Sequence, residues 1–234
     1  MNEQGPAVAP APRRRLLGGL LVRRERWGLS LPAKLVIIAF LLTFTMSFMR
    51  WGFSFLAVDA PIYSDILVVE GWIPKFGLEQ AIGQFRTGGY RQMLTSGGPA
   101  YIELGMHPKE TTAEWGAERI ESLGMPKDFV TAVPSWVEKK DRTYWSAVAV
   151  KRWLQRNAAS TKAINVLTVG PHARRTRLMY QKAFGDDFKV GIISVADPEY
   201  NPQHWWRTSE GVRDVVGETV AYIYARLLFR PSTS

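Results

Sequence analysis

The chain has 234 residues, of which 46% are hydrophobic, so its length and composition allow one well-packed core. It contains no cysteine, which excludes thiol catalysis, disulfide bonds and zinc–thiolate sites. The net charge is +9, but residues 1–50 hold eight Lys/Arg and only two acids. Because the positive charge gathers in this N-terminal part, we do not expect a nucleic-acid partner.

Residues 1–34 are typical of a basic, disordered tail on the cytoplasmic side of a membrane. They begin with a Pro/Ala-rich run and continue with arginines at positions 13–15, 23, 24 and 26. A segment of this composition has too few apolar side chains to form a core of its own.

The next stretch predicts a transmembrane anchor over residues 35–57, which would contact the lipid bilayer. No charged residue occurs from Leu35 to Met49, Arg50 can extend its charged end to the headgroups, and Trp51 suits the membrane surface. A cleaved signal peptide would have a shorter leading segment, since 34 residues precede this stretch. A buried core helix would show a polar face. We therefore expect an uncleaved signal anchor.

The charges on either side of this anchor predict its orientation. Seven Lys/Arg precede it, whereas only Arg50 lies near its far end. Segments that stay in the cytoplasm carry an excess of positive charge. We expect a single-pass protein of the inner membrane, with a cytoplasmic N-terminus and a periplasmic or otherwise extracytoplasmic C-terminal domain.

Residues 62–230 predict one α/β domain, because short apolar runs alternate with amphipathic helical patterns. The expected strands lie at 65–71, 90–98, 129–134, 164–170 and 190–197, and a helical pattern follows each of them. Such alternation indicates a doubly wound, mostly parallel, Rossmann-like sheet of about five strands. We expect Val68 and Leu167 to lie in adjacent central strands with both faces covered. The last helix carries its apolar residues in one stripe: Val212, Val215, Val216, Val220, Ile223 and Leu227.

The residues that follow the strands form the candidate site. Ligands on open α/β sheets bind beyond the carboxyl ends of the strands, where the strand order reverses. The polar and glycine residues at these ends include Glu70, Ser96, Gly97, Gly98, His172, Arg174 and Arg175. The Ser-Gly-Gly turn offers backbone N–H groups to an anion, although the same turn also serves as an ordinary strand exit.

The cations after the fourth strand raise an electrostatic question. His172, Arg174 and Arg175 stand in the first turns of a helix, where each positive charge costs about 0.3–1 kcal/mol. Either an external anion or an internal carboxylate neutralises them, with Glu70 as the obvious internal candidate, or the arginines are simply solvated. Glu70 closes an apolar strand, so it is either such a partner or a general base.

The histidines do not indicate a metal site. They stand at positions 107, 172 and 204, without the H-x-H or H-x-x-x-H spacing of metal ligands. His172 is either a capping residue or a hydrogen-bond donor and acid–base group. No motif identifies a cofactor.

The order of these segments, together with a C-terminal helix containing Glu218, resembles the bacterial YdcF/SanA/ElyC-like family over residues 62–228. The most specific elements are the Ser-Gly-Gly turn and the histidine followed three residues later by arginine, here His172 and Arg175. The resemblance implies one N-terminal membrane anchor, an extracytoplasmic α/β domain and a role in cell-envelope maintenance. It also implies a set of pocket residues: Ser96, Gly97, Gly98, Glu114, Thr143, His172 and Arg175.

We therefore expect a membrane-anchored domain that binds a small anionic ligand, phosphate- or nucleotide-like. Arg174, Arg175 and the Ser-Gly-Gly backbone would hold the anion, with His172 as a hydrogen-bond donor. One alternative is a hydrolase or transferase acting on a phosphate-bearing envelope precursor, with Glu70 or His172 as general acid or base. A second alternative is an interaction scaffold without a small-molecule site. The oligomeric state stays open.

Overall fold

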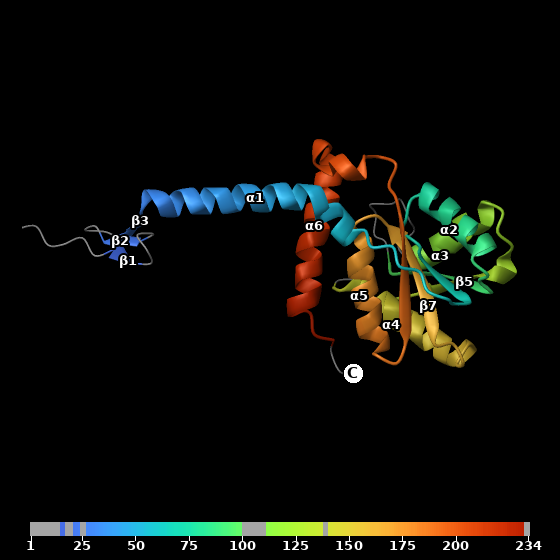
Figure 1. The fold of residues 1–234 in the computed structure, drawn as a ribbon. Coiled ribbons are helices and arrows are strands. Elements are labelled where there is room, and N and C mark those ends of the chain that lie inside the picture. Colours follow the sequence, from blue (N-terminus) through green and yellow to red (C-terminus); the bar gives the residue numbers. More distant parts are fainter. Residues whose placement is uncertain (1–14, 17–20, 24–26, 100–110, 138–139, 232–234) are drawn as a thin grey trace, which may run out of the picture. The chain divides into compact units, whose positions relative to one another are not determined.

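The structure is a computed structural model that describes residues 15–16, 21–23, 27–99, 111–137 and 140–231. The chain divides into two compact units, Met1–Phe48 and Met49–Ser234. The second unit contains the α/β domain (Figure 1).

The first unit contains three short strands and most of one long helix. Strands β1 (Arg15–Leu16), β2 (Leu21–Arg23) and β3 (Trp27–Leu29) pair antiparallel within the segment expected to be disordered. Helix α1 (Leu31–Leu56) has 26 residues and covers nearly all of the expected anchor. It is long and apolar enough to cross a membrane. Its last turns, from Met49 on, belong to the second unit.

The second unit is built on five parallel strands. They are β4 (Ile66–Glu70), β5 (Gln92–Gly97), β6 (Val130–Pro134), β7 (Ala163–Val169) and β8 (Lys189–Val195). Their order in the sheet is β6-β5-β4-β7-β8, which confirms the predicted α/β class. Along the chain, β4 is the first strand of this sheet and β7 is the fourth, yet they are neighbours in space. The strand order therefore reverses between them.

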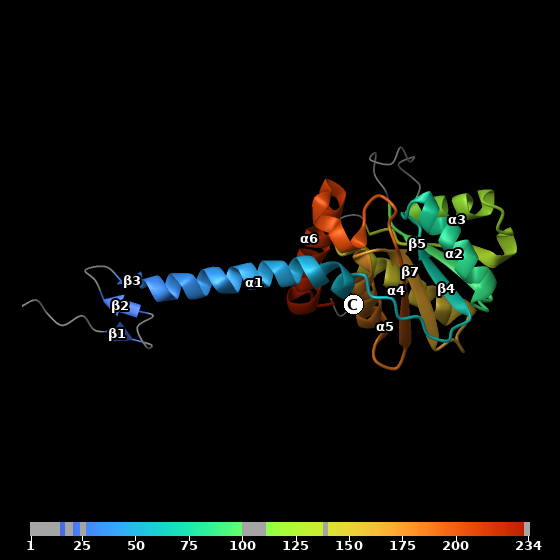
Figure 2. The ribbon, with the colours of Figure 1, turned by 45° about the horizontal axis from the view of Figure 1, so that its top comes forward.

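Helices cover both faces of this sheet (Figures 1 and 2). Helices α2 (Lys75–Thr87) and α3 (Thr112–Ser122) pack on one face with Leu67 and Val69 of β4. Helices α4 (Arg142–Asn157) and α5 (His172–Phe184) pack on the other face with Val68. Because successive strand residues point to opposite faces, β4 is apolar on both sides and fully buried.

The chain closes with helix α6 (Ser209–Ile223), continued by a π-helical turn over Tyr224–Leu228. The side chain of Thr208 caps α6 by accepting a hydrogen bond from the backbone of Gly211 (3.2 Å). Of the six residues in the predicted apolar stripe, only Val215 is buried. Helix α6 therefore leaves most of its apolar residues on the surface.

Helix α3 packs directly against the ends of β4 and β5, and glycines make this approach possible. A Cβ atom on Gly97 would lie 1.8 Å from Thr112 Oγ1, and one on Gly71 would lie 2.0 Å from the Thr112 carbonyl oxygen. A Cβ on Gly116 of α3 would lie 2.6 Å from Gly71 Cα. The glycines after these strands thus serve helix packing.

Gly97→Ala is expected to lower the free energy of unfolding by about 1–3 kcal/mol, because the new methyl group overpacks the contact with Thr112. The matched control is Gly83→Ala in α2, where nothing lies within 4 Å of the added Cβ. The free energy of unfolding of this variant should rise by about 0.5–1 kcal/mol, because alanine has a higher helix propensity than glycine. Urea unfolding of the full chain in detergent micelles measures both, and a Gly97→Ala variant as stable as Gly83→Ala would refute the packing role.

Candidate functional site

The candidate site lies where the strand order reverses. Glu70 ends β4, and Gly170-Pro171 leads from β7 into α5, whose first residue is His172. Since β4 and β7 are neighbours in register, their carboxyl ends bring Glu70 and His172 together. This is the place where doubly wound sheets bind their ligands.

Four charged side chains meet here, and we call Glu70, His172, Arg175 and Glu218 the charge cluster. Arg175 makes a bidentate pair with Glu218, with Nε 2.7 Å from Oε2 and Nη2 3.0 Å from Oε1. His172 Nδ1 lies 2.7 Å from Glu218 Oε1, and its Nε2 lies 3.6 Å from Glu70 Oε2. Arg175 Nη1 also donates to Thr143 Oγ1 (3.3 Å).

Carboxylates of the protein itself neutralise the cations His172 and Arg175 at the start of α5. Arg175 and a protonated His172 supply two positive charges, and Glu70 and Glu218 supply two negative charges. Glu218, contributed by α6, neutralises Arg175, whereas Glu70 faces His172. Their side chains are at most 18% exposed, so these pairs are only weakly screened by solvent. The donors of Arg175 are therefore engaged inside the protein.

Glu70 is the deepest member of the charge cluster. Thr168 donates a short hydrogen bond to its carboxylate, and the Thr176 hydroxyl lies 3.4 Å from the same oxygen. Burial would raise the pKa of Glu70, but the positive charge of His172 and the hydrogen bond from Thr168 lower it below its usual value. Glu70 stays ionised and positions His172.

His172 is an imidazolium at neutral pH. Burial would lower its pKa, and the charge of Arg175 also opposes protonation. The negative charge of Glu70 and the hydrogen bond to Glu218 prevail and raise the pKa to about 9. Burial would raise the pKa of Glu218, but its hydrogen bond with His172 and its pairing with Arg175 lower it to about 2. His172 is thus a proton donor and a fixed positive charge.

A cavity of about 330 Å³ opens beside His172. The residues that line it are Trp72, Pro74, Val169, Pro171, His172, Asp197, Arg213, Asp214, Gly217 and Glu218. The Trp72 ring packs edge-to-face on the imidazole with centroids 5.0 Å apart. This volume suits a small ligand.

Three further residues in the lining of the cavity add charges of both signs. Asp197 follows β8, and Arg213 and Asp214 belong to α6. Burial raises the pKa of Asp214, the charge of Asp197 adds to this, and Arg213 opposes it. The Tyr200 hydroxyl donates to Asp214 (3.4 Å). Within the described residues, no group of three or more His, Asp or Glu side chains is placed to hold a metal ion.

The predicted site residues of β5 and α3 lie away from this cavity. Ser96 is buried and shares a 2.9 Å hydrogen bond with the Tyr180 hydroxyl. The Gly98 carbonyl accepts from the Thr112 backbone (2.9 Å). Glu114 caps α3 through its carboxylate, which accepts from the backbone (2.9 Å) and the hydroxyl (2.8 Å) of Thr111. Ser96 thus links β5 to α5, Gly98 links the end of β5 to the start of α3, and Glu114 stabilises the first turn of α3.

The predicted site residues of α4 and α5 divide into two groups. Thr143 and Arg175 belong with His172, since Thr143 accepts a hydrogen bond from Arg175. Arg174 points elsewhere, with its guanidinium 4.0 Å from the centre of the Phe55 ring and a hydrogen bond to the Phe55 carbonyl. The structure therefore brings together Glu70, Thr143, His172 and Arg175 and leaves Arg174 outside the site.

Sequence reasoning missed the contribution of α6 to this site. Arg213, Asp214 and Glu218 all line the cavity, and Glu218 completes the charge cluster. The available signal was the spacing of Asp214 and Glu218, which are four residues apart and therefore share one helix face.

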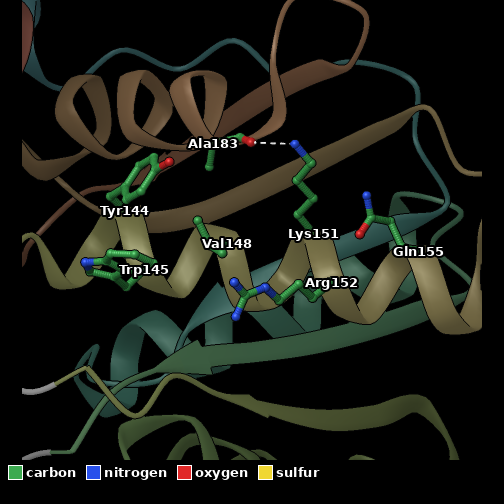
Figure 3. A pocket seen from close by; sticks show the side chains of 7 residues that line it. All are labelled: Tyr144, Trp145, Val148, Lys151, Arg152, Gln155 and Ala183. Carbon is green, nitrogen blue, oxygen red and sulfur yellow. Dashed lines mark hydrogen bonds between the residues drawn. The ribbon is translucent and has the colours of Figure 1, made fainter. Parts of the chain in front are cut away.

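A second hollow, of about 210 Å³, lies against α4 (Figure 3). The Lys151 ammonium group points to the end of α5 and donates to the carbonyls of Ala183 (2.9 Å) and Phe184 (3.4 Å). These are among the last carbonyls of α5, at the opposite end from His172. Lys151 therefore caps a helix here, and we take the cavity beside His172 as the candidate site.

Comparison of the chain with protein-family models and with curated proteins finds no match. The fold and the site define the class: a doubly wound α/β domain with a charged cavity at its strand-order reversal, preceded by a helix able to cross a membrane.

Proposed function

We propose that the chain is a single-pass membrane protein whose extracytoplasmic domain binds a small phosphate-bearing ligand in the cavity beside His172. One observation carries this proposal: an imidazolium, fixed by two carboxylates, borders a cavity of about 330 Å³ at the strand-order reversal. Since Glu70 and Glu218 balance the charges of His172 and Arg175, the positive charge that attracts an anionic group into this cavity is that of Arg213 in the same lining. Cell-envelope maintenance is the role that fits such a ligand outside the membrane.

The ligand anion would meet Arg213, since the donors of Arg175 are engaged by Glu218 and Thr143 and both ring nitrogens of His172 face carboxylates. Asp197 and Asp214 line the same cavity and accept hydrogen bonds from hydroxyl or amine groups. The chemistry therefore favours a ligand that carries both a phosphate and hydroxyl groups, such as a sugar phosphate. Trp72 supplies an aromatic wall for its less polar part.

The second candidate function is an enzyme that cleaves or transfers such a phosphate-bearing group. The observation that favours it is the pKa of His172, raised to about 9, together with the 2.7 Å contact between Nδ1 and Glu218. A histidine protonated at neutral pH and fixed in orientation can give a proton to a leaving oxygen. Glu70, buried and ionised behind it, would hold the imidazolium in place.

Arg213→Ala is expected to weaken binding of a sugar phosphate about tenfold or more, because it removes a charge-assisted hydrogen bond. The measurement is thermal shift of the full chain in detergent micelles with glucose 1-phosphate, glucose and inorganic phosphate, since a bound ligand raises the melting temperature. Release of inorganic phosphate in the same samples reports an enzyme.

The matched control is Arg152→Ala, an arginine that lines the second hollow. It should leave the thermal shift unchanged. A shift that survives Arg213→Ala and disappears with Arg152→Ala would place binding at α4, and no shift with any of the three compounds would count against a sugar-phosphate site.

A further inference from the structure

Helix α6 and its π-helical turn expose a continuous apolar surface. We call it the α6 face, and it consists of Val212, Val216, Val220, Ile223, Leu227 and Leu228, each between 40% and 71% exposed. The first five recur at helical spacings of three or four residues, so they share one side of the helix. A contiguous apolar surface of this kind marks a contact with another apolar phase or partner.

The α6 face lies next to the end of the candidate membrane helix. The Tyr222 ring of α6 packs edge-to-face on Phe55 of α1, with centroids 5.7 Å apart. Trp205, just before α6, donates its indole N–H to the Met49 carbonyl (3.1 Å). In both ribbon views α6 lies beside the last turns of α1 (Figures 1 and 2). Helix α6 is therefore held where the chain would leave a bilayer.

The charges and aromatic side chains around the α6 face suit lipid headgroups. In the described chain after residue 208, the exposed charged side chains are Arg213, Arg226 and Arg230. Trp51, near the end of α1, is 60% exposed. Arginine attracts anionic headgroups, and tryptophan prefers the membrane–water interface.

We propose that the α6 face rests on the surface of the bilayer that α1 crosses, as an interfacial helix lying in the membrane plane. This inference rests on the membrane anchoring in the proposed function. Lys182 would support the arrangement, because it ties the end of this segment to α5 through the carbonyls of Ala225 (2.8 Å) and Phe229 (3.0 Å). Since α6 also lines the cavity through Arg213 and Glu218, the cavity would open at headgroup level.

The absence of cysteine allows a direct test with single spin labels. The full chain is reconstituted in vesicles of phosphatidylethanolamine and phosphatidylglycerol, with one label at Val220→Cys, Leu227→Cys, Glu79→Cys or Leu42→Cys. Collisions with oxygen report the lipid phase, and collisions with a water-soluble nickel complex report the aqueous phase. Glu79 is the control, since it is an exposed residue of α2 on the other face of the sheet.

Labels at Val220 and Leu227 should collide several-fold more often with oxygen, and several-fold less often with nickel, than the label at Glu79. Nickel accessibility at Val220 equal to that at Glu79 would overturn the proposal. Protection from both reagents, with spin–spin broadening, would overturn it in favour of a second copy of the chain. The label at Leu42 tests the membrane anchor separately from the α6 face. If this label lies in the lipid phase, α1 is a membrane anchor even when the labels on the α6 face lie in water. If it lies in the aqueous phase, α1 is not a membrane anchor.

Discussion

Arg175→Ala is expected to lower the free energy of unfolding by about 3–5 kcal/mol, because it leaves Glu218 as a largely buried carboxylate without its bidentate partner. The variant also removes the hydrogen bond from Arg175 to Thr143 (3.3 Å). Urea unfolding of the full chain in detergent micelles measures the loss, with and without added phosphate. The loss should be the same in both conditions, since the partner of Arg175 is internal.

A second substitution identifies the partner of Arg175. Glu218→Gln in the Arg175→Ala background should recover much of the stability, whereas Glu70→Gln should recover little, because Glu70 faces His172. Arg174→Ala is the matched control from the same helix turn, and its effect should be small. If Arg175→Ala were as stable as the wild type and only the wild type gained stability from phosphate, the neutralising group would be an external anion.

The wild-type protein should lose on the order of 3 kcal/mol of stability as the pH rises from 6.5 past 9, because this is the free-energy equivalent of the His172 shift. Burial alone would lower the pKa of His172, but Glu70 and Glu218 raise it from 6.5 to about 9. A raised pKa gives stability that is complete below pH 6.5 and is lost as the pH rises through 9.

His172→Gln is the comparison for this pH dependence, since glutamine keeps hydrogen-bonding groups but does not titrate. The variant should show a much flatter profile between pH 6.5 and 9.5 in urea unfolding of the full chain. Parallel profiles for the two proteins would mean that other groups cause the loss and that His172 does not carry the charge.

Most of the fold could be predicted from the sequence, because the apolar patterns of its elements are local. Continuous apolar runs such as the one ending at Glu70 belong to strands buried on both faces, and the amphipathic pattern from Leu78 to Phe85 falls within α2. The order of the strands in the sheet depends on contacts between distant segments. The expected adjacency of Val68 and Leu167 is nevertheless confirmed, because β4 pairs directly with β7 in the centre of the sheet.

The candidate site was predicted in part for the same reason. Glu70 ends a strand and His172 closely follows one. Both could therefore be predicted, because ligands on parallel sheets bind at the carboxyl ends of the strands. Glu218 lies 46 residues after His172, in the helix α6 that follows the last strand of the sheet. Only the packing of α6 in three dimensions brings Glu218 to Arg175. Gly97 was expected to receive an anion, and the structure adds that the absence of its side chain serves the contact with Thr112, which the sequence does not reveal.

The protonation of His172 at neutral pH is tested most directly by nitrogen-15 NMR. The full chain, labelled at its histidines, is titrated in detergent micelles. The chain has three histidines, and the signal missing from His172→Gln assigns the one of interest. We expect a pKa of about 9 for His172, and a lower value in Glu70→Gln, because that substitution removes the negative charge opposite the imidazole. A pKa of His172 at or below 6.5 in the wild type would contradict this assignment, since the charge cluster would then not hold an imidazolium beside the cavity.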